Sequence, residues 1–518
     1  MQTKIAGASY RNWFTTDFGW FGQYALPGFV GSLLMTVGAL GVGWFPLSIN
    51  ILQWNVIEFL QTQTFGLALT RSFVVVGAAL LLQAWLVVGV DALHEKISET
   101  GTLLVTFFVW CLPILFAPPL FSRDVYSYYM QGRMQLAGFN PYNSGVAVLD
   151  GWFKSGVDPL WGDSPTPYGP AFLLIERIVA YLSGESAMLA AYLFRFASLG
   201  GVILMCYYIP KLARQHGVNP VTALWLGVMN PLVIMHFIAG AHNDALMVGL
   251  LCMALSLSID RKFLFAILIA TFALAIKPVA IVALPFIALT AAGAGASWKV
   301  RIRFGAIAAT SSFLTLFALS FVAGTGPFGW LASLSTPGTV KSWISPTTAA
   351  GMIIGGPIRF LGFGNHVDTA IAITRAIGSV VLLIVLIYLI AKPEGRSGAR
   401  GTALSLAALV ILGPVVQPWY LLWSIPLLAA TGLTHRQVRI LVLLLAAFTV
   451  HAIANSSATA DTFLELSDGI AMLLAAVTLG FAVIASPSER KLILGDEYEI
   501  DMLPRSLDEQ ASADAVQL

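Results

Sequence analysis

The chain has 518 residues, and its 28 Lys and Arg with 26 Asp and Glu make only 10% of them charged, where soluble proteins carry about 25%. Together with a hydrophobic fraction of 58%, this excludes a soluble globular enzyme, a disordered protein and a disulfide scaffold. A net charge of +2 leaves no basic stripe for nucleic acid. Long unbroken apolar runs also exclude a transmembrane barrel, so the sequence predicts an all-α, polytopic membrane protein.

Apolar runs long enough to cross about 30 Å of hydrocarbon recur along the chain. The predicted spans cover residues 27–47, 67–90, 102–120, 187–209, 221–240, 243–259, 304–323, 371–391, 440–455 and 467–485. Two further runs are interrupted, 263–292 at Lys277-Pro278 and 402–431 at Pro414 and at Gln417-Pro418. Each interrupted run is either one kinked helix or a pair of short helices that meet at the break.

Lys and Arg collect in cytoplasmic loops, so their positions predict the orientation. With the N-terminus inside, where Lys4 and Arg11 lie, splitting both interrupted runs into pairs places every basic connector inside. Treating 263–292 as one span would instead move the basic cluster 392–400 outside. We therefore predict about 14 membrane helices in the cell membrane, with both termini cytoplasmic.

The same topology predicts the domain organisation. Residues 1–485 form a single integral membrane domain, and residues 486–518 form a polar cytoplasmic tail. Residues 121–170 and 324–370 are predicted to be extracytoplasmic. Within or beside these segments, 345–361 is predicted as a re-entrant or surface-lying piece and 172–183 as a short interfacial helix. Cys111, Cys206 and Cys252 lie in apolar runs without zinc spacing and are predicted to act as small hydrophobic residues.

Unusual polar residues gather on the extracytoplasmic face in this topology. The loop 121–170 begins FSRDVYSY, continues through GFNPY and ends PTPYGP. The string AHND lies at an outer turn, Lys277 at the next outer break, and QPWY at another. Because unrelated polar residues would be distributed over both faces, this convergence predicts a single site.

Each of these motifs also has a purely structural interpretation. Arg123-Asp124 can be a local ion pair or helix cap, and His242-Asn243-Asp244 can be a tight turn in which Asn and Asp bond their own backbone. Trp419 and Tyr420 can belong to an interfacial aromatic belt. Lys277 lies between apolar runs, where an unpaired ammonium group is unfavourable, so it requires a partner or a function.

Taken together, the motifs predict an outward-facing cavity that contains a carboxylate, a few cations and several aromatic rings. Aromatic and amide side chains suit a sugar ring, and a cation at membrane depth suits a lipid phosphate. The combination fits glycosyl transfer from a lipid-phosphate sugar. In such a reaction the carboxylate takes the proton of the acceptor hydroxyl, and the cations stabilise the departing phosphate.

At these residues the sequence resembles a known family. FSRDVYSY followed by QG, GFNPY, TPYGPAF, ALWLGVMNPLVIMHFIAGAHNDALMVGLL, IKPVAIVALPF and QPWYLLW are similar to strings of the bacterial α-(1→6)-mannopyranosyltransferases. These are membrane enzymes of the GT-C superfamily that build the mannan backbone of lipomannan and lipoarabinomannan in mycobacteria and corynebacteria. The resemblance runs from about residue 100 to 430 in the same order along the chain.

The resemblance implies a metal-independent, inverting transferase without cofactors. Its donor would be polyprenyl-phosphate-mannose, and its acceptor a mannan or phosphatidylinositol-mannoside-type glycan at the membrane lipid surface. The superfamily pattern implies that Asp124 is the general base and that Arg123, His242 and Lys277 hold the donor phosphate. The remaining candidates for sugar and acceptor binding are Tyr126, Tyr128, Asn140, Tyr168, Asn243, Asp244, Gln417, Trp419 and Tyr420. One departure is that Asp124 follows the third predicted span, whereas the superfamily has this residue after the first.

Two alternatives remain open at the level of sequence. Nothing in the residues themselves excludes another polyprenyl-linked sugar such as arabinose, because only the family strings favour mannose. A transporter or flippase of lipid-linked sugar would also use broken helices and a buried cation, usually within internal repeats, and the chain shows no repeat. The strings do not separate a member that starts the mannan from one that extends it.

Overall fold

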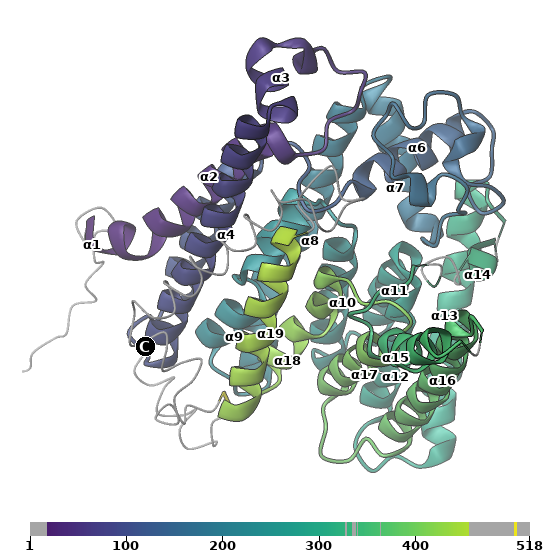
Figure 1. Cartoon of the computed structure of the whole chain (residues 1–518). Coiled ribbons are helices and arrows are strands. Elements are labelled where there is room, and N and C mark those ends of the chain that lie inside the picture. Colours follow the sequence, from purple (N-terminus) through teal and green to yellow (C-terminus); the bar gives the residue numbers. More distant parts are fainter. Residues whose placement is uncertain are drawn as a thin grey trace, which may run out of the picture.

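The computed structural model describes residues 18–326, 329–333, 338, 340–362, 364–454 and 502–504. In this part of the chain every regular element is a helix, apart from one isolated β-bridge between Leu433 and Met502. Figure 1 shows the helices as one bundle, which contains long helices such as α4 (Thr64–Leu93) and α8 (Ala187–Gln215) as well as shorter, interrupted ones. The prediction of an all-α fold is confirmed for the described residues.

Six helical segments of the described chain are long and apolar enough to cross a membrane. The first is Phe21–Val42, in which a π-helical turn continues into α2 (Leu26–Val42). The other five are α4 (Thr64–Leu93), α8 (Ala187–Gln215), α13 (Trp298–Ala323), α16 (Val367–Ala391) and α19 (His435–Ala454). A seventh is added if the π-helical segment Val233–Ala239 and α10 (Asp244–Ile259), which meet at a bend of 111°, form one broken span. About 14 spans are therefore not confirmed.

The difference in number arises because several predicted spans are short helices. These are α5 (Thr100–Ile114), α9 (Pro220–Gly227), α11 (Phe263–Ile276), α12 (Ala283–Ala292), α17 (Gly398–Leu412) and α18 (Ile425–Ala430). The longest of them has 15 residues and so a length of about 22 Å, less than the roughly 30 Å of hydrocarbon.

Both interrupted runs divide at the predicted breaks into pairs of short helices. Lys277 is extended (φ −138°, ψ 119°) between α11 and a 3-10 turn at Pro278–Val282 that leads into α12. Gln417 is extended in the same way before the 3-10 turn Pro418–Trp423, which leads into α18. The reason is local, since the proline ring disfavours helical geometry in the residue before it and removes a backbone donor.

The segment 121–170, predicted as a long loop, contains one helix, which pairs with the helix that follows the segment at one end of the bundle (Figure 1). α6 (Asp124–Leu136) packs against α7 (Pro170–Ser183), which corresponds to the predicted short helix 172–183 (Figure 1). Gly132 allows the close approach, because a Cβ atom there would lie 2.2 Å from the Glu176 carbonyl oxygen. Between them, residues 137–169 form turns and two 3-10 turns, Val146–Val148 and Pro159–Trp161.

The other segment predicted outside the membrane carries α14 (Gly329–Ala332) and α15 (Pro346–Phe360). α15 lies along α16 (Figure 1), and the two helices touch at Gly351, where a Cβ atom would be 2.4 Å from the Ile371 Cα atom. The predicted re-entrant or surface piece 345–361 is therefore a helix packed on another helix. The remaining short helices are α1 (Phe18–Trp20) and α3 (Asn55–Thr62).

Glycine pairs bring the long helices into close contact. Gly31 on α2 faces Gly77 on α4, and a Cβ on either glycine would lie within 2.6 Å of the other's carbonyl oxygen. Between α8 and α10, a Cβ on Gly249 would lie 2.4 Å from the Gly201 carbonyl oxygen, and one on Gly201 would lie 2.3 Å from the Ala245 carbonyl oxygen. Small residues at crossings are the usual means of packing helices where lipid surrounds them, because association there depends on close van der Waals contact.

Three buried polar side chains, two indoles and one guanidinium, form hydrogen bonds between the helices of the bundle. The indoles of Trp85 on α4 and Trp225 on α9 stack at 5.2 Å, and each N–H donates to the other residue's carbonyl oxygen, at 3.1 and 2.8 Å. Arg195 on α8 is 2% exposed and donates to four backbone carbonyls in the segments that follow α5 and precede α10. Carbonyl groups left free at helix ends are thereby satisfied.

Some predictions fall on residues that the structure does not describe. The predicted span 467–485, the basic residues Lys4 and Arg11, and the predicted tail 486–518, apart from residues 502–504, lie outside the described residues. The three cysteines are described, and each is buried with a free thiol, as predicted.

Candidate active site

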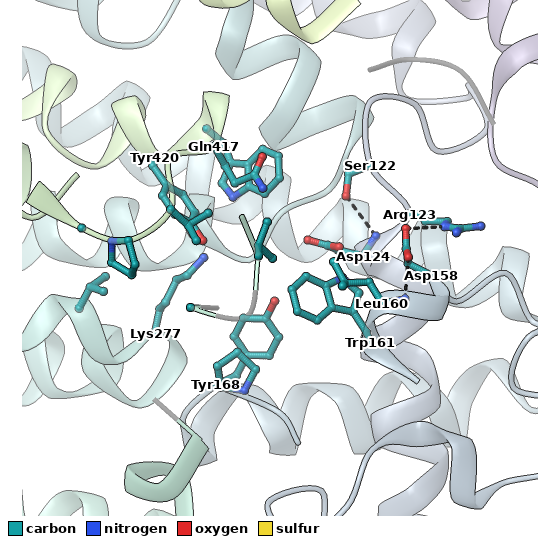
Figure 2. A pocket seen from close by; sticks show the side chains of 18 of the residues that line it. Ser122, Arg123, Asp124, Asp158, Leu160, Trp161, Tyr168, Lys277, Gln417 and Tyr420 are labelled. Carbon is teal, nitrogen blue, oxygen red and sulfur yellow. Dashed lines mark hydrogen bonds and ion pairs between the residues drawn. The ribbon is translucent and has the colours of Figure 1, made fainter. Parts of the chain in front are cut away.

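A cavity of about 740 Å³ lies where the helix breaks face the segment that leads into α6. Three stretches of chain supply most of its wall: residues 121–124 with 158–168, residues 277–279, and residues 409–423. Figure 2 shows Asp124 on one side of this cavity and Lys277 with Tyr420 on the other. Of the sequence-predicted site residues, Arg123, Asp124, Tyr168, Lys277, Gln417, Trp419 and Tyr420 line it.

Asp124 is the first residue of α6, and its backbone N–H donates to the Ser122 hydroxyl at 3.1 Å. Its side chain is 20% exposed, and Oδ2 lies 3.6 Å from Nδ1 of His242. Burial raises the pKa of Asp124 to about 6, and the neighbouring carboxylates of Asp158 and Asp244 act in the same direction, whereas Lys277 opposes them. A carboxyl group with such a pKa is a suitable proton acceptor near neutral pH.

Lys277 is held at the opposite wall by Asp244, the first residue of α10. Its Nζ atom lies 2.7 Å from Oδ1 of Asp244, which also accepts a hydrogen bond from the Trp423 indole. The ammonium group faces the rings of Tyr420 at 5.1 Å, Trp423 at 5.3 Å and Tyr168 at 5.9 Å. This aromatic cage fixes the cation beside the cavity. The predicted need for a partner at Lys277 is met by Asp244.

The second cation of the cavity is also paired. The Arg123 Nε atom donates to Oδ2 of Asp158 at 3.1 Å, and its guanidinium lies 4.4 Å from the centre of the Trp44 ring. Asp158 in turn caps the 3-10 turn Pro159–Trp161 by accepting from the Leu160 N–H at 2.9 Å. Figure 2 shows Arg123 directed away from the side of the cavity on which Lys277 lies.

His242 lies behind the cavity wall. Its ring is buried and stacks on Trp419, with centroids 3.8 Å apart, and a second buried histidine, His236, lies 5.2 Å from the same indole. Neither ring nitrogen of either histidine has a hydrogen-bond partner within 3.5 Å among the described residues. Nδ1 of His242 lies 3.6 Å from Oδ2 of Asp124, too far for a hydrogen bond but close enough for an ion pair, so the imidazole is placed to orient that carboxylate.

Three other sequence-predicted residues do not line the cavity: Tyr126 and Tyr128 are buried beside it, and Asn140 is partly buried in the loop after α6. The Tyr126 hydroxyl donates to the Trp44 carbonyl at 2.7 Å, and the ring of Tyr128 packs against Tyr168 and two phenylalanines. Asn140 caps a turn through the Tyr142 N–H at 3.0 Å. Their contacts support the walls of the cavity.

Asn243 and Asp244 lie beneath the cavity floor, where the chain turns from the π-helical segment into α10. Both side chains are buried, and Asp244 is 0% exposed. The chain turns sharply here, but not through the predicted bonds to its own backbone: the Asn243 side chain has no hydrogen-bond partner among the described residues, and the Asp244 carboxylate holds Lys277 and Trp423. Ala241, just before this turn, has φ +50°, a conformation that permits the sharp change of direction.

Cavity residues that sequence reasoning missed include Trp44, Asp158, Trp161 and Trp423. Asp158 and Trp161 lie in the loop 121–170, but no spacing distinguishes them from other polar or aromatic residues there. Trp44 belongs to the connection after α2, far from the other motifs in sequence, and only the fold brings it to Arg123.

The cavity has an asymmetric charge arrangement. Both cations that line it, Arg123 and Lys277, have a carboxylate partner within 3.1 Å. Among the described residues, Asp124 has no such Lys or Arg partner, and its ion-pair contact is the His242 imidazole at 3.6 Å. A base therefore faces an ammonium group across a space lined with aromatic rings. Such a site can deprotonate a hydroxyl and stabilise an anionic leaving group.

Comparison with known proteins places the chain in a family. It matches the models described as "Alpha-(1->6)-mannopyranosyltransferase, N-terminal domain" over residues 25–293 and "MptB C-terminal domain" over residues 347–487. A probable alpha-(1->6)-mannopyranosyltransferase of Mycolicibacterium smegmatis is 34% identical, and the match covers 87% of this chain and 86% of that protein.

Two further relatives agree. Alpha-(1->6)-mannopyranosyltransferase A of Mycobacterium tuberculosis is 32% identical over 79% of this chain and 80% of its own length. Alpha-(1->6)-mannopyranosyltransferase B of Corynebacterium glutamicum is 32% identical over 79% of this chain and 73% of its own length. No solved structure is significantly similar to the chain.

Proposed function

Because the chain belongs to the alpha-(1→6)-mannopyranosyltransferase family, we propose that it moves mannose from polyprenyl-phosphate-mannose to the 6-hydroxyl of a mannan acceptor. The acceptor class we propose is a mannan or phosphatidylinositol-mannoside-type glycan, and the product is the α-1,6-linked backbone of lipomannan and lipoarabinomannan. The cavity would face the outside of the cell membrane. The observation that carries the proposal is the Asp124 carboxylate, which has the His242 imidazole at 3.6 Å but no Lys or Arg ion pair in the described chain, opposite the caged Lys277 ammonium group.

The reaction we propose is a single displacement. Asp124 takes the proton of the acceptor 6-hydroxyl while that oxygen forms a bond to the anomeric carbon of the β-linked mannose. The bond from this carbon to the phosphate oxygen breaks, and its electron pair leaves with the polyprenyl phosphate. Attack from the face opposite the leaving group inverts the β-linkage into an α-linkage, with no need for a metal ion or cofactor in this scheme.

Lys277 is the main candidate for holding the donor phosphate. Its side chain remains 13% exposed and lines the cavity although Asp244 and three aromatic rings surround the ammonium group, so Lys277 can still donate to an incoming oxygen. The added negative charge of the phosphate would raise the proton affinity of Asp124 further, which strengthens it as a base. Arg123 is the second candidate, and binding through it requires sharing its guanidinium with Asp158.

His242 fits a positioning role for Asp124 better than direct phosphate binding, because its ring is covered by Trp419. Tyr168, Gln417, Trp419 and Tyr420 line the space between base and cation, and we propose that they contact the sugars. Aromatic faces stack on the C–H surface of a sugar, and the Gln417 amide can bond its hydroxyls.

A groove beside the cavity suits the polyprenyl tail. It encloses about 440 Å³ between the 3-10 turn with α12 and the facing side of α13, and most of its lining is apolar, including Leu274, Ile281 and Phe317. The turn Pro278–Val282 separates the groove from the cavity, since Pro278 and Val279 line the cavity and Ile281 lines the groove. A lipid whose phosphate lies at Lys277 could therefore extend its chain into the groove.

The direct test uses purified protein in lipid nanodiscs with labelled polyprenyl-phosphate-mannose and a short α-1,6-mannoside. We expect a longer glycan whose new linkage is α-1,6 by NMR. Asp124→Asn should lower the rate by about 10²–10⁴-fold, the usual effect of removing a general base, with donor binding retained. Asp163→Asn, an exposed carboxylate of the same loop, serves as the matched control.

The same assay decides between the alternatives. Equal transfer from a polyprenyl-linked arabinose donor would show that the family resemblance misleads about the sugar. Movement of the lipid donor across the membrane without any new glycosidic bond would identify a flippase. Full activity of Asp124→Asn would remove the assigned base.

A further inference from the structure

A second cavity of about 330 Å³, here called the distal pocket, lies at the other end of the same helices. α10 begins at Asp244 beside Lys277 and ends at Ser258 and Ile259, which line the distal pocket. α17 runs in the opposite direction, from Gly398 in the distal pocket to Leu409, which lines the first cavity. With 16 and 15 residues these helices are about 24 and 22 Å long, so the two cavities face opposite sides of the bundle.

The chain around the distal pocket is strongly basic. The segments 293–303 and 392–400 carry six basic residues, Lys299, Arg301, Arg303, Lys392, Arg396 and Arg400, against one acidic residue, Glu394. The carboxylate of Asp260 nearby is already engaged by Lys211 at 2.7 Å and by Gln215 at 2.8 Å. An excess of basic residues by itself only indicates orientation in the membrane, because cytoplasmic loops are basic in general.

What orientation does not explain is that two of these arginines line a cavity. Arg301 is 12% exposed, and its only carboxylate contact among the described residues is Glu394 at 3.6 Å, whose side chain is 73% exposed. Such an exposed pair contributes little, so the guanidinium is available to a second anion. Arg396 lines the same pocket and donates to the carbonyl of Lys392.

Backbone groups in the pocket also suit an anion. Gly398 and Ala399, the first residues of α17, line it, and the free N–H groups at a helix start attract negative charge. The buried Ser258 side chain, 2% exposed, belongs to the same lining, and its hydroxyl has no hydrogen-bond partner among the described residues. The pocket therefore offers two guanidinium groups, helix amides and a free hydroxyl.

The remaining walls are apolar and come from the helices themselves. Leu255 on α10, Phe286 and Leu289 on α12 and Leu389 on α16 line the side of the pocket that leads into the bundle. A basic end combined with an apolar wall is suited to an amphipathic ligand. Basic pockets of this kind between membrane helices bind the headgroups of anionic lipids.

We propose that the distal pocket binds the phosphate diester of an anionic membrane phospholipid. Arg301 and Arg396 would hold the phosphate oxygens, with the α17 amides beside them, and the first methylene groups of the acyl chains would lie along Leu255, Phe286 and Leu389. The bound lipid is distinct from the glycosyl donor, because the pocket lies at the opposite end of α10 and α17. Its binding does not depend on transfer at the first cavity.

The test is native mass spectrometry of the full-length protein, titrated with phosphatidylglycerol or with diacylglycerol of the same acyl chains. We expect a one-to-one complex with phosphatidylglycerol and none with diacylglycerol, which lacks only the phosphate headgroup. The double variant R301Q/R396Q should raise the Kd about tenfold or more, since it removes two charged donors. R303Q, an exposed arginine on the same helix, should leave the Kd within about twofold, which is the effect expected of a screened surface charge.

A second variant keeps the test decisive if R301Q/R396Q does not fold. Glu394 is an exposed side chain, so E394Q should fold normally and bind phosphatidylglycerol more tightly, because it frees Arg301. Equal losses in R301Q/R396Q and R303Q would reduce the effect to general surface charge and overturn the proposal. Displacement of the lipid by glycerol 3-phosphate at equal concentration would also overturn it, because the ligand would then be a soluble phosphate.

Discussion

At the scale of single residues, two of the three carboxylates at the cavity form ion pairs with Arg or Lys, and the third, Asp124, does not do so with any described residue. Asp158 and Asp244 hold Arg123 and Lys277, and each of them fixes a cation in place. Asp124 has an imidazole at 3.6 Å as its nearest such partner in the described chain. Because a carboxylate paired with a cation is a weaker base, the pairing pattern itself distinguishes the reacting group from the positioning groups.

The raised pKa of Asp124 predicts how transfer depends on pH. The base acts in its ionised form, so kcat should fall about tenfold per pH unit at low pH and level off at high pH. The pKa of Asp124 is about 6 in the free protein, and the bound donor phosphate should move the midpoint of kcat above this value. Burial raises this pKa, Asp158 and Asp244 add to the increase, and Lys277 and a hydrogen bond from Trp161 oppose it, while His242 lies 3.6 Å from the carboxyl group. The measurement is kcat at saturating donor across the pH range, with intrinsic tryptophan fluorescence as a check that the fold persists. A rate that stays constant down to about pH 4 would contradict the assignment.

The pair formed by Lys277 and Asp244 requires a balanced substitution. Changing Lys277 alone leaves a fully buried carboxylate unpaired, which would destabilise the protein by about 3–5 kcal/mol. The double variant K277Q/D244N removes both charges and keeps two hydrogen-bonding amides. We expect it to fold and to raise the KM for the lipid donor by about tenfold or more, since a charge-assisted contact is lost.

The control for this variant is the KM for the acceptor, which should change much less. Donor affinity is best measured directly, by binding of the donor to the protein in nanodiscs without acceptor. An unchanged donor affinity would return Lys277 to a structural role in closing the break after α11.

At the scale of elements, the breaks in the helices form the site, and they were predictable because proline acts locally. α11 ends immediately before Lys277-Pro278, and α17 ends at Leu412, before Pro414 and Gln417-Pro418, so both helices stop at the predicted breaks, which line the cavity. The 3-10 turns that follow, and the π-helical segment Val233–Ala239, were not predicted, since they depend on which carbonyl each N–H reaches in the packed bundle.

Contacts between side chains that are distant in sequence could not be predicted for a related reason. The sequence indicated that Lys277 requires a partner or a function but did not identify the partner, because Asp244 is 33 residues away and is placed by the bend before α10. The salt bridge from Arg123 to Asp158 and the stacking of His242 on Trp419 likewise depend on loops whose paths no periodic pattern describes.

The groove between α12 and α13 supports a prediction at this scale. Ala309 is an exposed residue that lines the groove, so Ala309→Trp should obstruct it. We expect the KM for a long-chain polyprenyl donor to rise about tenfold, while a donor with a short isoprenoid chain is used as before, because only the long chain reaches the obstruction.

Ala306→Trp is the matched control, since Ala306 is an exposed residue of the same helix but does not line the groove. An equal effect of Ala309→Trp on long and short donors would show that the substitution disturbs the cavity through α13 itself. No effect on either donor would place the tail elsewhere.

At the scale of the whole molecule, the two cavities predict which loops lie on opposite sides of the membrane. The three native cysteines are buried, so a new exposed cysteine can be labelled against a low background. We expect Gly151→Cys, in the loop between α6 and α7, to react with an impermeant maleimide added to intact cells. Gly295→Cys, in the loop before α13, should react only after the membrane is opened, because the basic segments are predicted to lie inside.

These two positions are suitable because a Cβ atom at either would meet nothing within 4 Å, although both glycines have positive φ, which makes the substitution mildly strained. Expression at wild-type level is therefore part of the measurement. Reaction of both cysteines from the same side would contradict the predicted orientation and leave the number of spans to be recounted.

The shortness of the helices around the cavity has a consequence for how the donor is handled. α11, which ends at Lys277, has 14 residues and is about 21 Å long, roughly 9 Å less than the hydrocarbon layer. A lipid phosphate bound at Lys277, as proposed, would therefore remain near its depth in the bilayer. Extracting a lipid exposes its chain at about 0.8 kcal/mol for each methylene group, so a long isoprenoid can react here while its tail stays in the bilayer.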